Sequence, residues 1–177
     1  MSTPRLATVW LDGCSGCHMS FLDTDDALLE LSTLCTVVYS PLVDTKEFPE
    51  GVDVTLVEGS VSSVEDEEKI ARVRRRTRIL VALGDCAVTG NVPAMRTPFP
   101  LEAVLHRAFV ETAQLNPGPP TRVIPRLLPR VRPVHEVVPV DVVIPGCPPP
   151  AAAILDTVKA LLAGQTPRVA ELTRFGR

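Results

Sequence analysis

Five short apolar segments rich in β-branched residues recur along the chain and predict buried strands. They are Leu6–Leu11, Cys35–Tyr39, Val52–Val57, Ile79–Leu83 and Val140–Ile144. Within each segment the apolar residues run almost continuously instead of alternating with polar ones. This pattern is typical of parallel strands that are covered by helices on both faces.

The segments between these strands carry helical patterns, over His18–Leu31, Ser62–Thr77, Leu101–Leu115 and Ala151–Ala163. Ser62 and Glu65 stand in the spacing of a capping box at the start of the second helix. Gly164 is suited to end the last of these helices. Strands that alternate with helices predict an α/β fold with a mostly parallel sheet and helices on both faces.

Length and composition predict one domain that spans residues 1–177. A chain of 177 residues, 45% hydrophobic and 22% charged, can bury one real core and has ordinary globular composition. The net charge of −3 argues against a nucleic-acid binder. The basic run Arg72–Arg78 ends a helix that starts with acidic residues, which complements the helix dipole.

The distribution of apolar residues also predicts where the protein works. No apolar run approaches the roughly 20 residues that a membrane span needs, and the first residues lack the pattern of a signal peptide. We therefore expect a cytoplasmic protein without a membrane association. Disulfides are rare in a reducing cytosol, so the five cysteines favour metal binding or redox chemistry.

Prolines mark one region of the chain. Of 18 prolines, 14 fall between Pro93 and Pro150. Proline fixes φ and removes a hydrogen-bond donor, so this region cannot be regular helix or central strand throughout. We expect residues 116–139 to form a proline-rich excursion that lies on the surface or on a partner.

Four of the cysteines follow predicted strands and have a glycine close before them. Cys14 and Cys17 follow the first strand, Cys86 the fourth and Cys147 the fifth. The carboxyl ends of parallel strands meet at one edge of a sheet, where open α/β folds bind ligands. The sequence therefore predicts that these four cysteines form one site. Cys35 starts the second strand and is interpreted as a packing residue.

Four thiolates suit one [4Fe–4S] cluster, and the neighbouring glycines allow the tight turns that a compact cluster needs. A structural Zn²⁺ site also uses four cysteines, although usually as two local pairs. A thioredoxin-like thiol oxidoreductase would use Cys14 and Cys17 and leave the other two unexplained. FMN is not expected on this chain, because the loop after the first strand carries the cysteines instead of a phosphate cradle.

Four motifs together resemble the small subunit of [NiFe] hydrogenases, and the short chain resembles the cytoplasmic NAD-reducing (bidirectional) type. The motifs are CSGC after the first strand, VEGSV at Val57–Val61, GDC at Gly84–Cys86 and PGCPP at Pro145–Pro149. The resemblance runs from Leu6 to about Leu162. It implies a flavodoxin-like fold and a proximal [4Fe–4S] cluster on Cys14, Cys17, Cys86 and Cys147.

The resemblance also implies partners. A large subunit would hold the Ni–Fe centre that splits H₂, so we expect no catalytic residue on this chain. Electrons would pass to iron–sulfur and flavin diaphorase subunits that reduce NAD⁺. No cysteine follows Cys147, so one cluster is expected. The related complex I subunit has two adjacent cysteines in its first motif, whereas Ser15 and Gly16 separate them here. A complex I-like iron–sulfur subunit and a structural zinc-binding interaction domain remain the alternatives.

Glu58 ends the third strand, on the same edge as the cysteines. It is expected either as a surface carboxylate or capping partner of Ser62, or, from its place in the VEGS motif, as a residue that lines the cluster or subunit interface near a proton route. His18 could donate to a cluster sulfide, although solvent-facing histidines are more common.

Overall fold

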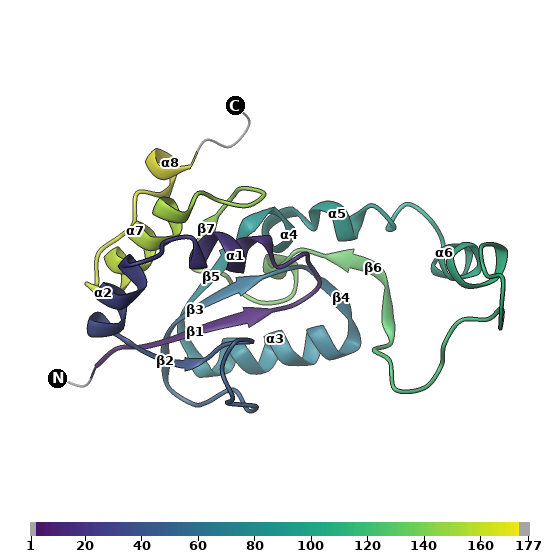
Figure 1. Cartoon of the computed structure of the whole chain (residues 1–177), viewed down its shortest axis with the longest axis horizontal. Helices are drawn as coiled ribbons and strands as arrows, with labels where there is room; N and C mark the ends of the chain where they lie inside the picture. The colour runs from purple at the N-terminus through teal and green to yellow at the C-terminus, as the bar shows by residue number, and fades with distance from the viewer. Residues whose placement is uncertain (1–2, 174–177) are drawn as a thin grey trace.

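The five predicted strands form one parallel sheet in the computed structural model, which describes residues 3–173. They are β1 (Arg5–Trp10), β2 (Thr36–Tyr39), β3 (Val52–Glu58), β5 (Thr77–Leu83) and β7 (Val142–Ile144). Their order in the sheet is β2-β1-β3-β5-β7 (Figure 1). Counted along the chain this is the order 2-1-3-4-5 of flavodoxin-like folds, so the predicted fold class is confirmed.

Helices cover both faces of this sheet. One face carries α1 (Gly16–Leu22), α2 (Ala27–Leu34) and α7 (Ala151–Leu162), and the other carries α3 (Val64–Arg76). Successive residues of β5 alternate between the two faces: Leu80 packs in the α3 layer and Val81 in the α7 layer. Both are fully buried, which explains why the strand sequences are apolar at nearly every position.

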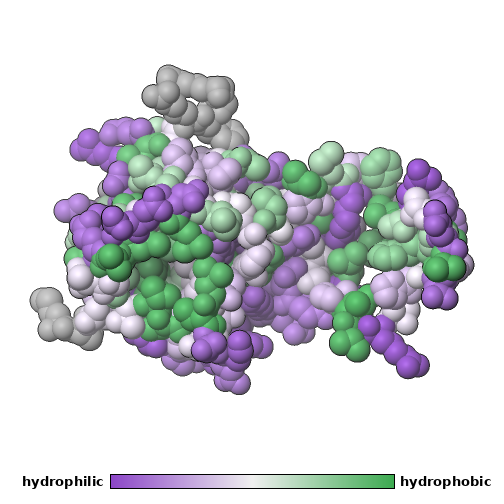
Figure 2. Space-filling model, in the orientation of Figure 1, coloured by the Kyte–Doolittle hydropathy of each residue, from purple (hydrophilic) through white to green (hydrophobic). Residues whose placement is uncertain are grey.

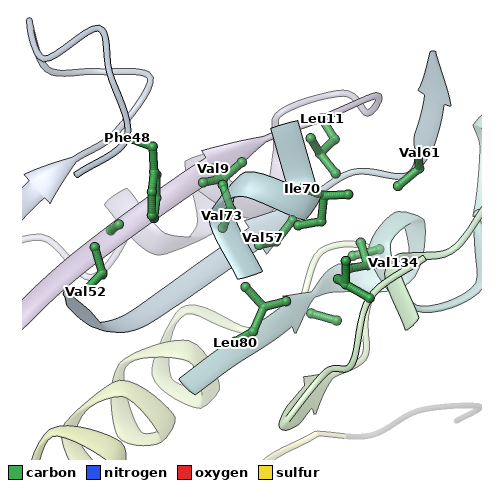
Figure 3. Close-up of a cluster of buried hydrophobic side chains, with 14 residues drawn as sticks. Val9, Leu11, Phe48, Val52, Val57, Val61, Ile70, Val73, Leu80 and Val134 are labelled. Carbon is green, nitrogen blue, oxygen red and sulfur yellow. The ribbon is translucent and has the colours of Figure 1, made fainter. Parts of the chain in front are cut away.

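The α3 side of the sheet contains the core shown in Figure 3. Ile70 and Val73 of α3 lie against Val9, Val57 and Leu80 of three neighbouring strands, and all five side chains are inaccessible to solvent. Each fully buried aliphatic side chain contributes about 1.5–3 kcal/mol relative to an exposed one. This layer fixes the sheet, and with it the strand ends that carry the candidate site.

Two helix predictions need correction. The single helix predicted over His18–Leu31 is two helices, α1 and α2, separated by a turn in which Asp25 has a φ of +49°. The capping box of α3 lies one residue later than predicted. Ser63 accepts a hydrogen bond from the Asp66 N–H at 3.1 Å, and the Asp66 carboxylate accepts one from the Ser63 N–H at 3.0 Å.

Residues 91–126, which we call the arm, extend away from the sheet towards one end of the molecule (Figure 1). The chain enters the arm from α4 (Gly84–Thr89). The arm contains α5 (Asn91–Ala94), α6 (Leu101–His106) and a π-helical turn, η1 (Arg107–Glu111), so the helix predicted over Leu101–Leu115 is shorter than expected.

The predicted proline-rich excursion over residues 116–139 is confirmed only for its first part, because the chain returns to the core after residue 126. Residues 116–126 are exposed, but β6 (Leu127–Arg132) pairs antiparallel with β4 (Val61–Ser63), and the 3₁₀ turn η2 (Val134–Glu136) follows. Val131, Val134 and Val138 are buried, and Val134 and Val138 belong to the core on the α3 side of the sheet. A short helix, α8 (Val169–Leu172), ends the described chain.

Candidate cluster-binding site

The carboxyl ends of four strands are aligned in register. Trp10 of β1 pairs with Glu58 of β3, Glu58 with Leu83 of β5, and Leu83 with Ile144 of β7. The four predicted cysteines follow three of these ends: Cys14 and Cys147 lie in the loops after β1 and β7, and Cys17 and Cys86 lie in the first turns of α1 and α4 (Gly84–Thr89). Parallel topology therefore brings segments more than 100 residues apart to a single edge, as the sequence predicted.

Direct contacts join the loop after β5 to the loop after β7. The Asp85 N–H donates to the Gly146 carbonyl at 2.8 Å, and the Gly146 N–H donates to the Asp85 carboxylate at 2.7 Å. The Asn91 amide nitrogen lies 3.4 Å from the Cys147 sulfur and 4.0 Å from the Cys86 sulfur. These contacts bring the two single cysteines beside each other.

Gly84 brings the Cys-x-x-Cys loop to the same place. Its φ is +79°, and a Cβ added there would lie 2.2 Å from the Cys17 sulfur. Only glycine leaves room for this thiol beside the start of α4. Cys17 is buried, Cys86 is half-buried, and Cys14 and Cys147 are exposed. Two of the four cysteines are therefore accessible to solvent or to a partner.

Glu58 is buried beneath the Cys-x-x-Cys loop, with a relative exposure of 1%. Its carboxylate accepts hydrogen bonds from the His18 N–H at 2.9 Å and the Cys17 N–H at 3.4 Å, and it pairs with the His18 Nδ1 atom. The surface-carboxylate interpretation is wrong, as is the capping role for Ser62. Glu58 fixes the backbone that carries Cys17.

His18 is also buried, so the expectation of a solvent-facing histidine is wrong. Its ring stacks on Trp10 with centroids 6.0 Å apart. Its Nε2 atom is buried and has no hydrogen-bond partner within residues 3–173. The sequence could not reveal the His18–Glu58 pair, because 40 residues separate its members and only the register of β1 and β3 joins them.

The loops after β1 and β3 approach each other closely at Gly59, which has a φ of +91°. A Cβ added to Gly59 would lie 2.7 Å from the Leu11 carbonyl carbon and 2.8 Å from the Asp12 oxygen. Asp12 and Ser60 exchange two backbone hydrogen bonds, of 3.1 and 2.7 Å. This contact holds the first cysteine loop against the carboxyl end of β3.

The thiols are electrostatically coupled. Burial raises the pKa of Cys17, and the Glu58 carboxylate and the other three cysteines raise it further. Burial, Cys14 and Cys147 likewise raise the pKa of Cys86, while the hydrogen bond from Asn91 lowers it. Without a bound metal, the Cys17 thiol therefore stays protonated at neutral pH. A bound metal cation would compensate the negative charge of the thiolates.

The donor set fits an iron–sulfur cluster. Four cysteines from three loops can each supply one thiolate to a [4Fe–4S] cluster. Zn²⁺ requires its thiolates about 2.3 Å from a single point. In the described range 3–173, no three His, Cys, Asp or Glu side chains converge in a way that could hold one ion. Cys35 is 3% exposed in the core beneath α2, which confirms its packing role.

Asn91 is a polar residue of the site that the sequence did not single out, and Asp85 entered only as part of the GDC motif. The local signal for Asn91 was the Gly90–Asn91 dipeptide, a turn sequence. No helix within residues 3–173 has both the length and the hydrophobicity to cross a bilayer.

A family model described as "NADH ubiquinone oxidoreductase, 20 Kd subunit" matches residues 14–161. The chain is 43% identical over 166 residues to the delta chain of the NAD-reducing hydrogenase HoxS of Cupriavidus necator, covering 91% of this chain and 79% of that protein. It is 39% identical over 167 residues to a chain of the F420-non-reducing hydrogenase vhu of Methanocaldococcus jannaschii. This match covers 93% of the present chain but only 58% of the longer archaeal protein.

Solved structures agree with these relatives. A chain in the crystal structure of an NAD⁺-reducing [NiFe]-hydrogenase in the H₂-reduced state superposes with a TM-score of 0.93 at 40% identity, covering 98% of this chain and 99% of that chain. A chain of the Dm. baculatum [NiFeSe]-hydrogenase gives a TM-score of 0.63 at 18% identity, covering 92% of this chain and 63% of that chain. This second match supports the fold alone. Together the comparisons confirm the resemblance predicted from the four motifs.

Proposed function

Because the chain belongs to the NADH ubiquinone oxidoreductase 20 Kd subunit family, and within it to the small subunits of hydrogenases, we propose that it is the electron-transfer small subunit of an NAD-reducing [NiFe] hydrogenase. The observation that carries this proposal is the placement of four cysteines in three loops at one edge of the sheet. The complex I-like alternative is disfavoured because Cys14 and Cys17 are separated by two residues.

In this proposal Cys14, Cys17, Cys86 and Cys147 hold one [4Fe–4S] cluster, and the chain works in the cytoplasm. The cluster, when bound, takes up and releases single electrons. The chain positions the thiols, shields Cys17 and fixes its loop through Glu58. Hydrogen is split at the Ni–Fe centre of the large subunit, and diaphorase subunits with iron–sulfur clusters and flavin pass the electrons to NAD⁺.

Metal analysis of the anaerobically purified complex tests the cluster. We expect a brown protein with a reduced-cluster EPR signal and about four iron atoms for this chain. Cys86→Ala should lose this signal. Cys35→Ala should keep it, since Cys35 packs in the core. A colourless protein with one zinc per chain would select the zinc-binding alternative, and activity that depends on Cys14 and Cys17 alone would select the thiol oxidoreductase.

We further propose that the large subunit covers the cysteine edge and the arm. Cys14 and Cys147 are exposed at that edge. The arm carries exposed apolar side chains, among them Met95 (71% exposed) and Phe99 (60%), and hydrophobic atoms are visible at that end of the molecule (Figure 2). Such a patch on a segment with little core of its own is typical of a surface that a partner covers.

Met95→Ser tests this arrangement, with Leu29→Ser as its matched control. Both side chains are 71% exposed, but Leu29 lies on α2 and Met95 on the arm. We expect Met95→Ser to reduce the amount of nickel-containing large subunit that co-purifies, and Leu29→Ser to leave it unchanged. Equal recovery with both variants would contradict the proposed position of the large subunit.

A further inference from the structure

The turn between α4 and α5 directs an amide side chain at two of the cysteines. Gly90 has a φ of +84° and Asn91 a φ of +37°, so two consecutive residues adopt the left-handed region. A Cβ on Gly90 would lie 2.8 Å from the Cβ of Ala94. Glycine is therefore needed at position 90, and asparagine is among the few other residues that adopt this backbone readily.

This unfavourable backbone is stabilised by local hydrogen bonds. The Gly90 N–H donates to the Cys86 carbonyl at 3.0 Å, and the Asn91 N–H donates to the Thr89 hydroxyl at 3.3 Å. The Thr89 hydroxyl in turn donates to the Asp85 carbonyl at 2.9 Å. A strained conformation that its surroundings hold in this way is characteristic of functional sites.

The result is one amide nitrogen placed 3.4 Å from the Cys147 sulfur and 4.0 Å from the Cys86 sulfur. These two cysteines follow different strands, β5 and β7, so the amide contacts two of the three cysteine-bearing segments. A thiolate that is bound to iron can only accept hydrogen bonds. The asparagine amide meets this demand with its two N–H donors.

We propose that Asn91 sets the reduction potential of the cluster by donating hydrogen bonds to the Cys86 and Cys147 sulfurs. This inference rests on the proposed function, because it requires the cluster. Reduction adds negative charge to the cluster and its sulfurs, and an N–H donor stabilises that charge. Hydrogen bonds to the sulfurs are one of the main determinants of the potential of such clusters. Asn91 therefore raises the potential and favours electron uptake.

Redox titration of the cluster EPR signal in the intact, anaerobically purified complex tests the assignment. Asn91→Asp keeps the side-chain volume but replaces the donor with a negative charge, and it should lower the midpoint potential most. Asn91→Gly keeps the left-handed backbone and removes the amide, and it should lower the potential by a smaller amount. Asn116→Gly is the control, since Asn116 also has a left-handed φ of +50° but lies in the exposed part of the arm.

The outcomes separate this inference from the proposed function. A wild-type complex without iron and without the EPR signal would overturn the proposed function itself. If the wild type holds the cluster but both Asn91 variants keep its midpoint potential, or raise it, the role of Asn91 is refuted. If both variants lose the iron entirely, Asn91 maintains the loop and does not set the potential, which also refutes the proposal. The titration follows only loaded clusters, so partial iron loss does not obscure a shift.

Discussion

The two ends of the parallel sheet are stabilised by different chemistry. At the carboxyl end, Gly59 lies against the backbone of the loop after β1 and Gly84 against the Cys17 sulfur, so neither has room for a Cβ. The buried Glu58 carboxylate accepts hydrogen bonds from backbone N–H groups there. At the amino end, arginines form ion pairs on the surface. These pairs are Arg74–Asp141, Arg76–Glu50 and Arg78–Asp53.

This difference shows at which end of the sheet a substitution disturbs the structure and at which end a substitution is tolerated. A close backbone approach or a buried carboxylate leaves no room for adjustment, and a change there displaces a cysteine. Exposed ion pairs are screened by water and salt, and each contributes little to stability. We therefore expect substitutions at the carboxyl end to affect the cluster and those at the amino end to affect only stability, and slightly.

The largest effect is expected from Gly84→Ala. The added methyl group would lie 2.2 Å from the Cys17 sulfur, so this thiol must move away from its position at the site. The variant should lose most of its iron and its EPR signal, measured by metal analysis and spin quantitation.

Gly164→Ala is the matched control for Gly84→Ala. Gly164 has a similar φ of +71° but nothing within 4 Å of its added Cβ. It should keep its full iron content and lose only about 1 kcal/mol of stability from the left-handed backbone. Full iron content in Gly84→Ala would contradict the inference that the Cys17 thiol can reach its position only when residue 84 is glycine.

Glu58→Ala should have the next largest effect. It leaves the buried N–H groups of Cys17 and His18 without an acceptor, and each unsatisfied group costs about 1–3 kcal/mol. We expect a loss of about 3 kcal/mol in the free energy of unfolding and a lower iron content. Glu68→Ala, at an exposed position on α3, should change the free energy by less than about 0.5 kcal/mol.

Glu58→Gln separates the structural role of Glu58 from the proposed proton route. The Cys17 and His18 N–H groups are accepted by different carboxylate oxygens, and glutamine keeps one of these two acceptors while it removes the negative charge. The iron content should therefore fall less than in Glu58→Ala. If Glu58 lies on a proton route, H₂ turnover should still fall. Unchanged turnover, assembly and cluster spectrum would leave Glu58 as the residue that positions the loop and nothing more.

Much of this arrangement could be predicted from the sequence, because the relevant signals are local. Each parallel strand is a continuous apolar run, and each cysteine loop follows one directly. Once the strands are taken as parallel, Cys14, Cys86 and Cys147 must share an edge. The prediction for Cys35 succeeded for the same reason, since Cys35 directly precedes β2 and so lies at the amino end of the sheet, away from the edge that carries the other four cysteines.

The predictions that failed depend on contacts between distant segments. The burial of Glu58 and His18 follows from the register of β1 and β3, which the sequence does not encode locally. Two strands were not predicted from the sequence. β4 is only three residues long, and β6 contains Pro129, a residue that is rare inside strands. The contact of Asn91 with two cysteines required the shape of one left-handed turn.

The smallest effect should come from Asp141→Asn at the amino end. Burial raises the pKa of the Asp141 carboxyl, but the hydrogen bond from the Leu80 N–H and the Arg74 guanidinium outweigh it, and the net pKa is lowered. The ionised form therefore stabilises the folded state above the unfolded pKa of about 3.9, and this stabilisation is lost as the pH falls through the folded pKa.

At pH 7 we expect Asp141→Asn to lower the free energy of unfolding by only about 0.5 kcal/mol, because its side chain is 44% exposed and the pair is screened. Urea unfolding at several pH values should show this difference shrinking as the pH approaches about 4. Asp156→Asn, at an exposed position on α7, provides the control for loss of a surface charge. A large, pH-independent decrease in the free energy of unfolding, together with loss of iron, would contradict the distinction between the two ends. The amino end would then also determine whether the cluster is bound.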